Sequence, residues 1–203
     1  TWNGLRRRRT MAIMTPEDRV RDLAARGDLQ GAATEALRWL GPEVLGYLAA
    51  MVKSEADAAE VFSQFAEDLW RGLPGFRWES SLRTWAYRIA YHAAVRFARD
   101  PYRQRGQRFE TTMASRVADD VRRSSVLRHD LREQQLAALR AALDPDERTL
   151  LVLRLDRKLS WREVAEVLAA QGEAPADEVA LRKRFERIKD KLGKKAREAG
   201  LIE

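Results

Sequence analysis

The last quarter of the sequence carries the pattern that most limits how this chain can fold. Ser160 and Glu163 stand at the spacing of a capping box, which starts a helix. Gly172 ends that helix, and Asp177 is placed to cap a second one. Residues 181–197 of the second helix contain nine Lys or Arg and only two acidic residues. The pattern predicts two helices joined by a turn, of which the second is strongly basic.

On a helical wheel, the second helix divides into an apolar side and a cationic side. The apolar arc is formed by Leu181, Phe185, Ile188, Leu192 and Ala196, and the opposite side by Lys183, Arg187, Lys191 and Lys194. One side can pack on a core while the other presents cations, as in a helix-turn-helix whose second helix enters a DNA major groove. A solvated helix in a charge-rich protein is the alternative.

Composition excludes several classes of site. The chain has 203 residues, a formal net charge of +7, no cysteine and two histidines, His92 and His129. It therefore offers no disulfide framework and no thiolate or histidine zinc site, and we expect no cofactor. No apolar run approaches the roughly 20 residues of a membrane span. Residues 1–14 are basic without an apolar region behind them, so we expect a leader or disordered arm rather than a secretory signal, and a cytoplasmic protein.

The body of the chain reads as helical almost throughout, which predicts an all-α protein. Ala, Leu, Arg and Glu dominate, and no segment alternates with a period of two. We expect a break at Gly41-Pro42 and another at residues 73–75. The expected helices are 16–26, 29–40, 42–52, 57–70, 81–99, 126–143 and 145–157. Residues 100–126 are polar and poor in Leu, so we expect a flexible linker between two small helical domains, 15–99 and 127–203.

The predicted helix at 57–70 has two distinct sides. One arc is apolar and would be buried: Ala58, Val61, Phe62, Phe65 and Leu69. The opposite arc is polar and mainly acidic: Asp57, Glu60, Gln64, Glu67 and Asp68. The polar arc is either an ordinary solvated face or a docking face for a basic partner.

Residues 76–99 combine aromatic and basic side chains. Trp85, Arg88, His92, Arg96 and Arg99 follow one another at spacings of three and four, which places them along one flank of a helix. The short stretch before it, residues 77–81, adds an aromatic, a carboxylate and two hydroxyls. Single-stranded nucleic acid is bound by this combination, because cations follow phosphates and aromatic faces stack on bases. The alternative is that the tryptophans fill gaps in the core.

Two blocks of the sequence resemble a known family. The stretch D-A-A-E-V-F-S-Q-F-A-E-D-L-W-R-G-L-P-G-F-R-W-E-S-S-L-R-T-W-A-Y-R-I-A-Y-H is similar to region 2 of extracytoplasmic-function sigma factors, small members of the sigma-70 class. The stretch L-D-P-D-E-R-T-L-L-V-L-R-L-D-R-K-L-S-W-R-E-V-A-E-V-L, with the basic helix after it, resembles their region 4. The resemblance covers about residues 28–197 and implies two small helical domains.

The resemblance also implies roles for individual residues. Docking on the clamp of the large RNA polymerase subunits would fall to Asp57, Glu60, Gln64, Glu67 and Asp68. Binding of the promoter −10 element would fall to Arg77, Trp78, Glu79, Ser80, Ser81, Arg83, Trp85, Arg88, His92 and Arg96. Recognition of the −35 duplex would fall to Val179, Ala180, Arg182, Lys183, Arg184 and Arg187. Residues 100–126 would run toward the polymerase active centre.

The implied function is that of a promoter-specificity subunit without covalent chemistry. Its partners would be core RNA polymerase, through the clamp and flap of the large subunits, promoter DNA, and an anti-sigma factor as a further protein partner. One alternative is a stand-alone helix-turn-helix regulator whose N-terminal domain dimerises. Another is an enzyme acting on nucleic acid. The sequence argues against an enzyme, because it has neither a carboxylate cluster with metal-ligand spacing nor a Gly-rich phosphate loop.

Overall fold

A computed structural model of the chain describes residues 14–52, 54–99, 113–125, 143–169 and 175–198. The expected arm, the first half of the expected linker, the expected helix at 126–143 and most of the turn after residue 169 lie outside these residues. The described part is all-α, and no strand occurs in it. None of its helices is both long enough and apolar enough to cross a membrane.

Five helices form an N-terminal bundle: α1 (Pro16–Ala25), α2 (Leu29–Met51), α3 (Glu55–Gly72), α4 (Leu82–Arg99) and α5 (Met113–Ser125). A short 3-10 turn, η1 (Leu73–Gly75), follows α3. Each of the first three helices begins with a capping residue whose side chain accepts a hydrogen bond from a backbone N–H of the first turn. These residues are Thr15 for α1, Asp28 for α2 and Ser54 for α3. The core of the bundle contains Phe62, Phe65, Tyr47 and Tyr87, all fully buried.

Helix α2 runs unbroken through the site where the sequence predicts a break. Pro42 lies inside this helix, so the prediction of two helices ending and starting at Gly41-Pro42 is wrong. A proline here removes one helical hydrogen bond, to the carbonyl of Arg38. Both Arg38 and Pro42 are exposed, so water can reach that carbonyl. Packing of both halves of α2 on one core outweighs the local cost, since Leu37, Leu40, Val44 and Leu48 are all buried.

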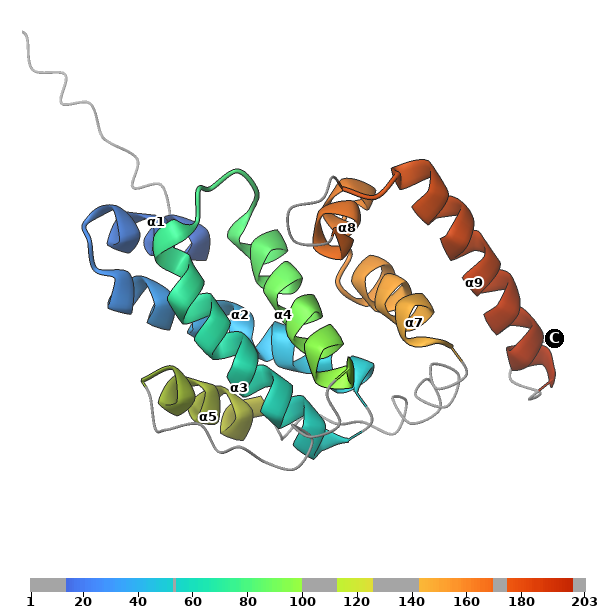
Figure 1. Ribbon diagram of the computed structural model, residues 1–203, viewed down its shortest axis with the longest axis horizontal. Coiled ribbons are helices and arrows are strands. Elements are labelled where there is room, and N and C mark those ends of the chain that lie inside the picture. The colour runs from blue at the N-terminus through green and yellow to red at the C-terminus, as the bar shows by residue number, and fades with distance from the viewer. Residues whose placement is uncertain (1–13, 53, 100–112, 126–142, 170–174, 199–203) are drawn as a thin grey trace, which may run out of the picture.

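Part of the expected linker is a helix packed on the bundle. Helix α5 lies against both α2 and α3 (Figure 1). Val121 faces Gly41 of α2 so closely that a Cβ on that glycine would lie 3.1 Å from the valine methyl carbons. Arg122 donates hydrogen bonds of 3.1 Å to the Ala59 carbonyl and to the Ser63 hydroxyl of α3. Residues 113–125 therefore differ from the flexible segment expected from composition, because small apolar side chains spaced along them find a matching surface.

The C-terminal unit consists of α7 (Pro145–Leu151), the π-helical turn η4 (Val152–Asp156), α8 (Trp161–Leu168) and α9 (Glu178–Glu198). Its first helices begin with the two predicted capping boxes, Asp144 with Glu147 and Ser160 with Glu163. Helix α9 packs on α7 and α8 through the predicted apolar arc. Leu181, Phe185, Ile188 and Ala196 are buried and Leu192 is partly buried.

The C-terminal unit lies against the N-terminal bundle. Helix α8 packs on α4, and α7 and η4 contact α2 (Figure 1). One contiguous cluster of buried apolar side chains runs from Val20 in α1 to Ile188 in α9. The contact between α4 and α8 brings the two DNA-binding regions that the sequence predicts into a single body.

Candidate nucleic-acid interface

The loop between η1 and α4 is ordered by aromatic packing. Trp78 has a positive φ of 59°, which is uncommon for a residue with a side chain. Its ring lies 4.8 Å from that of Phe76, and the Arg21 guanidinium covers it at 4.7 Å. Arg77 and Glu79, on either side of it, are exposed. The loop therefore presents a cation and a carboxylate to solvent, whereas Trp78 is engaged within the protein.

Helix α1 also fixes the far end of this loop. The Glu17 carboxylate accepts a hydrogen bond of 2.9 Å from the backbone N–H of Leu82, the first residue of α4. Ser81 begins the same helix, with its hydroxyl accepting a 3.0 Å hydrogen bond from the Thr84 N–H. Ser80 is half-buried. Glu17 and Arg21 were not among the predicted site residues, because nothing local in the sequence links α1 to a loop some sixty residues later.

The α4 flank comprises the α4 residues that the resemblance assigns to the −10 element: Arg83, Trp85, Arg88, His92 and Arg96. Trp85 is half-buried, and its ring stacks on that of Phe76 at 4.6 Å with an interplanar angle of 22°. It also lies against Gly72, where a Cβ would be 3.1 Å from the indole ring. Trp85 thus packs against the loop and stays only partly open to solvent.

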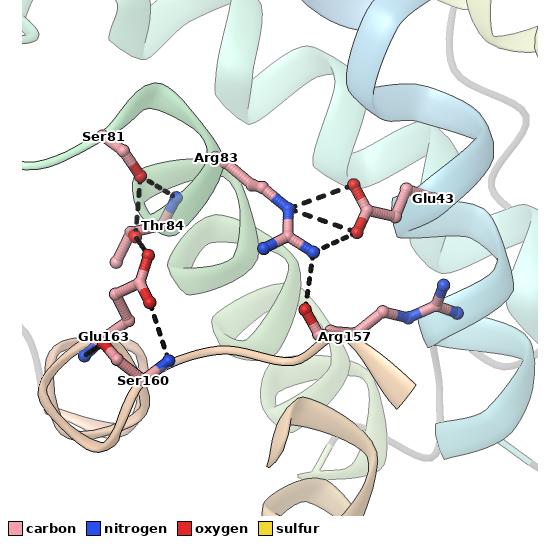
Figure 2. Close-up of polar contacts among 7 residues, drawn as sticks. All are labelled: Glu43, Ser81, Arg83, Thr84, Arg157, Ser160 and Glu163. Atoms are coloured by element: carbon pink, nitrogen blue, oxygen red, sulfur yellow. Dashed lines mark hydrogen bonds and ion pairs between the residues drawn. The ribbon is translucent and has the colours of Figure 1, made fainter. Parts of the chain in front are cut away.

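Arg83 joins the bundle to the C-terminal unit (Figure 2). Its guanidinium forms an ion pair with Glu43 of α2 and donates a 2.7 Å hydrogen bond to the backbone carbonyl of Arg157. Hydrogen bonding to Glu43 raises the pKa of Arg83. Burial acts to raise the pKa of Glu43, but the hydrogen bonds and charge of Arg83 outweigh it and lower that pKa. Both groups are therefore charged at neutral pH.

His92 also faces the C-terminal unit. Its Nε2 lies 3.1 Å from the carbonyl oxygen of Ala169, at the end of α8. Burial lowers the pKa of His92, and the neighbouring cations Arg88 and Arg96 lower it further. Arg88 is half-buried, while the exposed Arg96 forms an ion pair with Asp68 of α3. The flank is thus a cationic row whose middle is covered by the C-terminal unit.

Helix α9, the predicted recognition helix, presents its first turns to solvent. Asp177 caps it by accepting a 3.0 Å hydrogen bond from the Val179 N–H. Val179 is 57% exposed, and Ala180 is also exposed. The predicted cations divide into two kinds. Arg182 and Arg184 pair with acidic groups, Glu178 for the first and Asp144 with Asp146 for the second.

The other two predicted cations of α9 are unpaired. Lys183 and Arg187 are exposed, and neither forms an ion pair with a described residue. They lie one helical turn apart, on the side away from the buried Leu181 and Phe185. These two side chains are the ones available to an anion without breaking an existing ion pair.

Four of the five residues predicted for a docking face on α3 are partly open to solvent. Asp57, Glu60, Gln64 and Asp68 are half-buried, and the Gln64 amide donates a 2.9 Å hydrogen bond to Asp68. Burial raises the pKa of Glu60. Glu67 does not share this face, because its side chain is only 5% exposed and forms an ion pair with Arg71. The prediction for Glu67 is wrong because a helical wheel assumes one buried arc, whereas α3 packs against three helices, α2, α4 and α5.

The fold and these surfaces define a class: an all-α protein with a basic terminal helix and a cationic helix beside an ordered polar loop. Residues 38–106 match the family model of sigma-70 region 2. The chain is also 25% identical over 126 residues to the RNA polymerase sigma factor YlaC of Bacillus subtilis (strain 168). The aligned part covers 62% of this chain and 73% of that protein. Both similarities support a sigma-70 family member of the extracytoplasmic-function type, with the family model matching the region 2 part of the chain.

Proposed function

We propose that this chain is an RNA polymerase sigma factor that selects promoters by their −35 and −10 elements and assists their opening. The observation that carries the proposal is the extent of the region 2 match. It begins within α2 and continues past α4, so it contains the docking face, the loop and the α4 flank in one unit. A stand-alone regulator needs a duplex-binding helix but has no use for an ordered polar loop beside a cationic helix.

Helix α9 supports the assignment of −35 recognition. Its exposed first turns, with Val179, Lys183 and Arg187, form the part of a recognition helix that reaches base edges and phosphates in a major groove. The buried arc fixes the rotation of the helix, so these side chains cannot turn inward. Val179 offers an apolar surface of the kind that contacts thymine methyl groups.

The loop and the α4 flank support the assignment of −10 binding. Once DNA strands separate, unpaired bases can be contacted on their polar edges and phosphates by nearby cations. Arg77 and Glu79 are exposed on the loop for the first task, and Arg88 and Arg96 lie along α4 for the second. Glu17 and Arg21 of α1 would act as positioning residues that hold the loop in shape.

The partner implied by the docking face is core RNA polymerase, with an anti-sigma factor as a further protein partner. The test is run-off transcription with purified core polymerase on genomic fragments, followed by mapping of the start sites. Paired templates then separate the two DNA surfaces: an ordinary promoter, and the same promoter with a pre-melted −10 bubble. Glu79→Ala or Ser80→Ala should reduce transcription more on the ordinary template, and Arg187→Ala should reduce it equally on both. No start site with core polymerase, together with tight duplex binding by the chain alone, would support a stand-alone regulator instead.

A further inference from the structure

Helix α1 and the residue that caps its C-terminus carry three arginines, which differ in their partners. Arg19 pairs with Glu35 of α2 at 2.8 Å, and Arg26 pairs with Asp22, one turn earlier, at 2.7 Å. Arg21 is exposed and forms no hydrogen bond or ion pair with a described residue. Among these three cations, Arg21 is therefore the one whose charge is open to an anion from outside the chain.

The carboxylate one turn before Arg21 is already engaged. Asp18 accepts hydrogen bonds from the backbone N–H of Thr15 at 3.0 Å and from its hydroxyl at 2.6 Å. These hydrogen bonds lower the pKa of Asp18, and the charge of Arg21 makes the smallest contribution in the same direction. Asp18 thus serves the capping box of α1 and leaves the donors of Arg21 free.

The Arg21 guanidinium lies at the end of an aromatic stack. Its Cζ is 4.7 Å from the centre of the Trp78 ring, and the Trp78 ring is 4.8 Å from that of Phe76. Phe76 in turn stacks on Trp85 at 4.6 Å, so the stack runs from α1 through the loop to the α4 flank. An arginine that packs its face on an aromatic ring keeps the N–H groups at its edge available for a phosphate.

Glu17 holds the same side of α1 against the loop. It lies one helical turn before Arg21, so the two side chains share one side of the helix. Its carboxylate accepts a 2.9 Å hydrogen bond from the backbone N–H of Leu82, where the loop meets α4. Arg19 extends instead toward α2. Because α1 contacts the loop both at Leu82 and at Trp78, the Arg21 guanidinium has a defined position beside it.

We propose that Arg21 binds a backbone phosphate of the single-stranded DNA held by the loop and the α4 flank. This inference rests on the proposed function, and it adds a contact from a helix that precedes residues 38–106, the part matched by the region 2 model. A phosphate is bound most strongly by a cation that is already oriented and has no carboxylate to leave. Trp78 orients the guanidinium through its face alone. Arg21 thus contacts the strand in addition to supporting the loop.

Three variants separate a phosphate contact from the support of Trp78. Arg21→Gln removes the charge and leaves a planar amide that can still lie on the indole ring. Arg21→Lys keeps the charge on a flexible side chain. Arg19→Gln makes the same charge change two residues away, at an arginine that already has a carboxylate partner. Circular dichroism and thermal melting check that all three variants keep the fold of the unaltered chain.

The measurement is binding of the full chain to a dye-labelled oligothymidine, followed by fluorescence anisotropy at several salt concentrations. One phosphate contact on a single strand contributes about 0.7 to the slope of log affinity against log salt. We expect Arg21→Gln to reduce the slope by about this amount, so that its loss of affinity grows about fivefold for each tenfold dilution of the salt. Arg21→Lys should restore the slope, and Arg19→Gln should leave it nearly unchanged. On a duplex of the same length, Arg21→Gln should not alter the slope, because duplex binding is assigned to α9.

Each contrary outcome has one meaning. An unaltered slope in Arg21→Gln would show that Arg21 only packs on Trp78. A slope that Arg21→Lys fails to restore would show that the variants act through the shape of the loop. An equal reduction in Arg19→Gln, or on the duplex, would show that net charge and not a strand contact is responsible. The assay contains neither polymerase nor a promoter. A strand contact of Arg21 without any start site in run-off transcription would therefore remove the proposed function and keep this site.

Discussion

The cationic side chains of α9 differ in whether a carboxylate of the chain already pairs with them. Arg184 lies 3.5 Å from Asp146 and 3.9 Å from Asp144 of the neighbouring helix start. Arg187 is exposed and has no ion pair with a described residue. A cation that must first leave its carboxylates gains less from a phosphate than one that is free.

We therefore expect Arg187→Ala to weaken duplex binding by polymerase carrying this chain and to reduce the slope of log affinity against log salt by about one. Arg184→Ala should change the slope much less. Fluorescence anisotropy on one −35 duplex at several salt concentrations gives both slopes. Equal losses in the two variants would show that the ion pairs of Arg184 do not persist in the complex.

His92 should make stability depend on pH. Its pKa in the folded chain is below the ordinary value of 6.5, because burial disfavours the charged ring. The unfolded chain therefore binds more protons as the pH falls below 6.5, and stability decreases in that direction. Arg88 and Arg96 act in the same sense by repelling the imidazolium.

The expected result is a melting temperature that falls between pH 7 and pH 5 by less in His92→Gln than in the unaltered chain. Glutamine can still donate to the Ala169 carbonyl but does not titrate. Thermal melting followed by circular dichroism at pH 5, 6 and 7 provides the comparison. Parallel curves for both proteins would mean that His92 is solvated well enough to titrate normally.

Residue roles were predictable from the sequence where a single helix determines them. The caps at Asp144 and Ser160 and the buried arc of α9 follow from spacing alone and are present. Glu163 shows the limit. The spacing of Ser160 and Glu163 already accounts for Glu163 as part of a capping box. The sequence therefore gives no sign of the hydrogen bond between Glu163 and Thr84, which is 79 residues away. Trp85 was assigned to an open flank for the same reason, since its partner Phe76 belongs to a loop.

Among the helices, α2 contains an internal proline, Pro42, which costs the helix one backbone hydrogen bond. Pro42 is exposed, so replacing it would restore one hydrogen bond without changing the core. We expect Pro42→Ala to stabilise the chain by about 1–2 kcal/mol, after allowing for the greater freedom of the unfolded state. Pro145→Ala, at the first position of α7, should not stabilise it, because proline suits that position. Urea unfolding measures both, and no gain in Pro42→Ala would indicate that α2 is already relaxed around the proline.

Helix α3 separates its core side from its docking side cleanly enough for a surface variant. Asp57→Arg combined with Gln64→Arg should abolish association with core polymerase while leaving the fold intact, since Phe62 and Phe65 lie on the other side. The variant pair Asp22→Arg with Gln30→Arg, on α1 and α2, makes the same charge change elsewhere. Co-purification with core polymerase measures the effect. Normal co-purification of the α3 variant, with an unchanged circular dichroism spectrum, would show that this face is only solvated surface.

At the scale of the whole molecule, the packing of the two units leaves the two proposed DNA surfaces unequally accessible. The first turns of α9 are exposed, whereas the α4 flank is partly covered by α8. We expect the free chain to bind a promoter duplex weakly and to gain specificity only with core polymerase, which fixes the distance between the surfaces. Affinity for one promoter, measured with and without core polymerase, tests this. Tight and sequence-specific binding by the chain alone would contradict it.

The arrangement of the two units could not be predicted from the sequence. Periodicity identified nearly every described helix, but the contact between α4 and α8 depends on single hydrogen bonds between distant residues. Helix α5 was missed because composition averages over residues 100–126. Its buried positions Ala114, Val117, Ala118 and Val121 are too few and too small to stand out in a polar segment.

The π-helical turn at Val152–Asp156 sets a condition on chain length. Such a turn holds one residue more than a regular helical turn, and here it accompanies five consecutive buried residues, 149–153. The wide turn already absorbs one extra residue, so adding a further residue in regular helical geometry would rotate everything after it by about 100°. Both capping boxes would survive, yet Glu163 would no longer face Thr84. Related chains should therefore exchange side chains between Pro145 and Ser160 more readily than they gain a residue there.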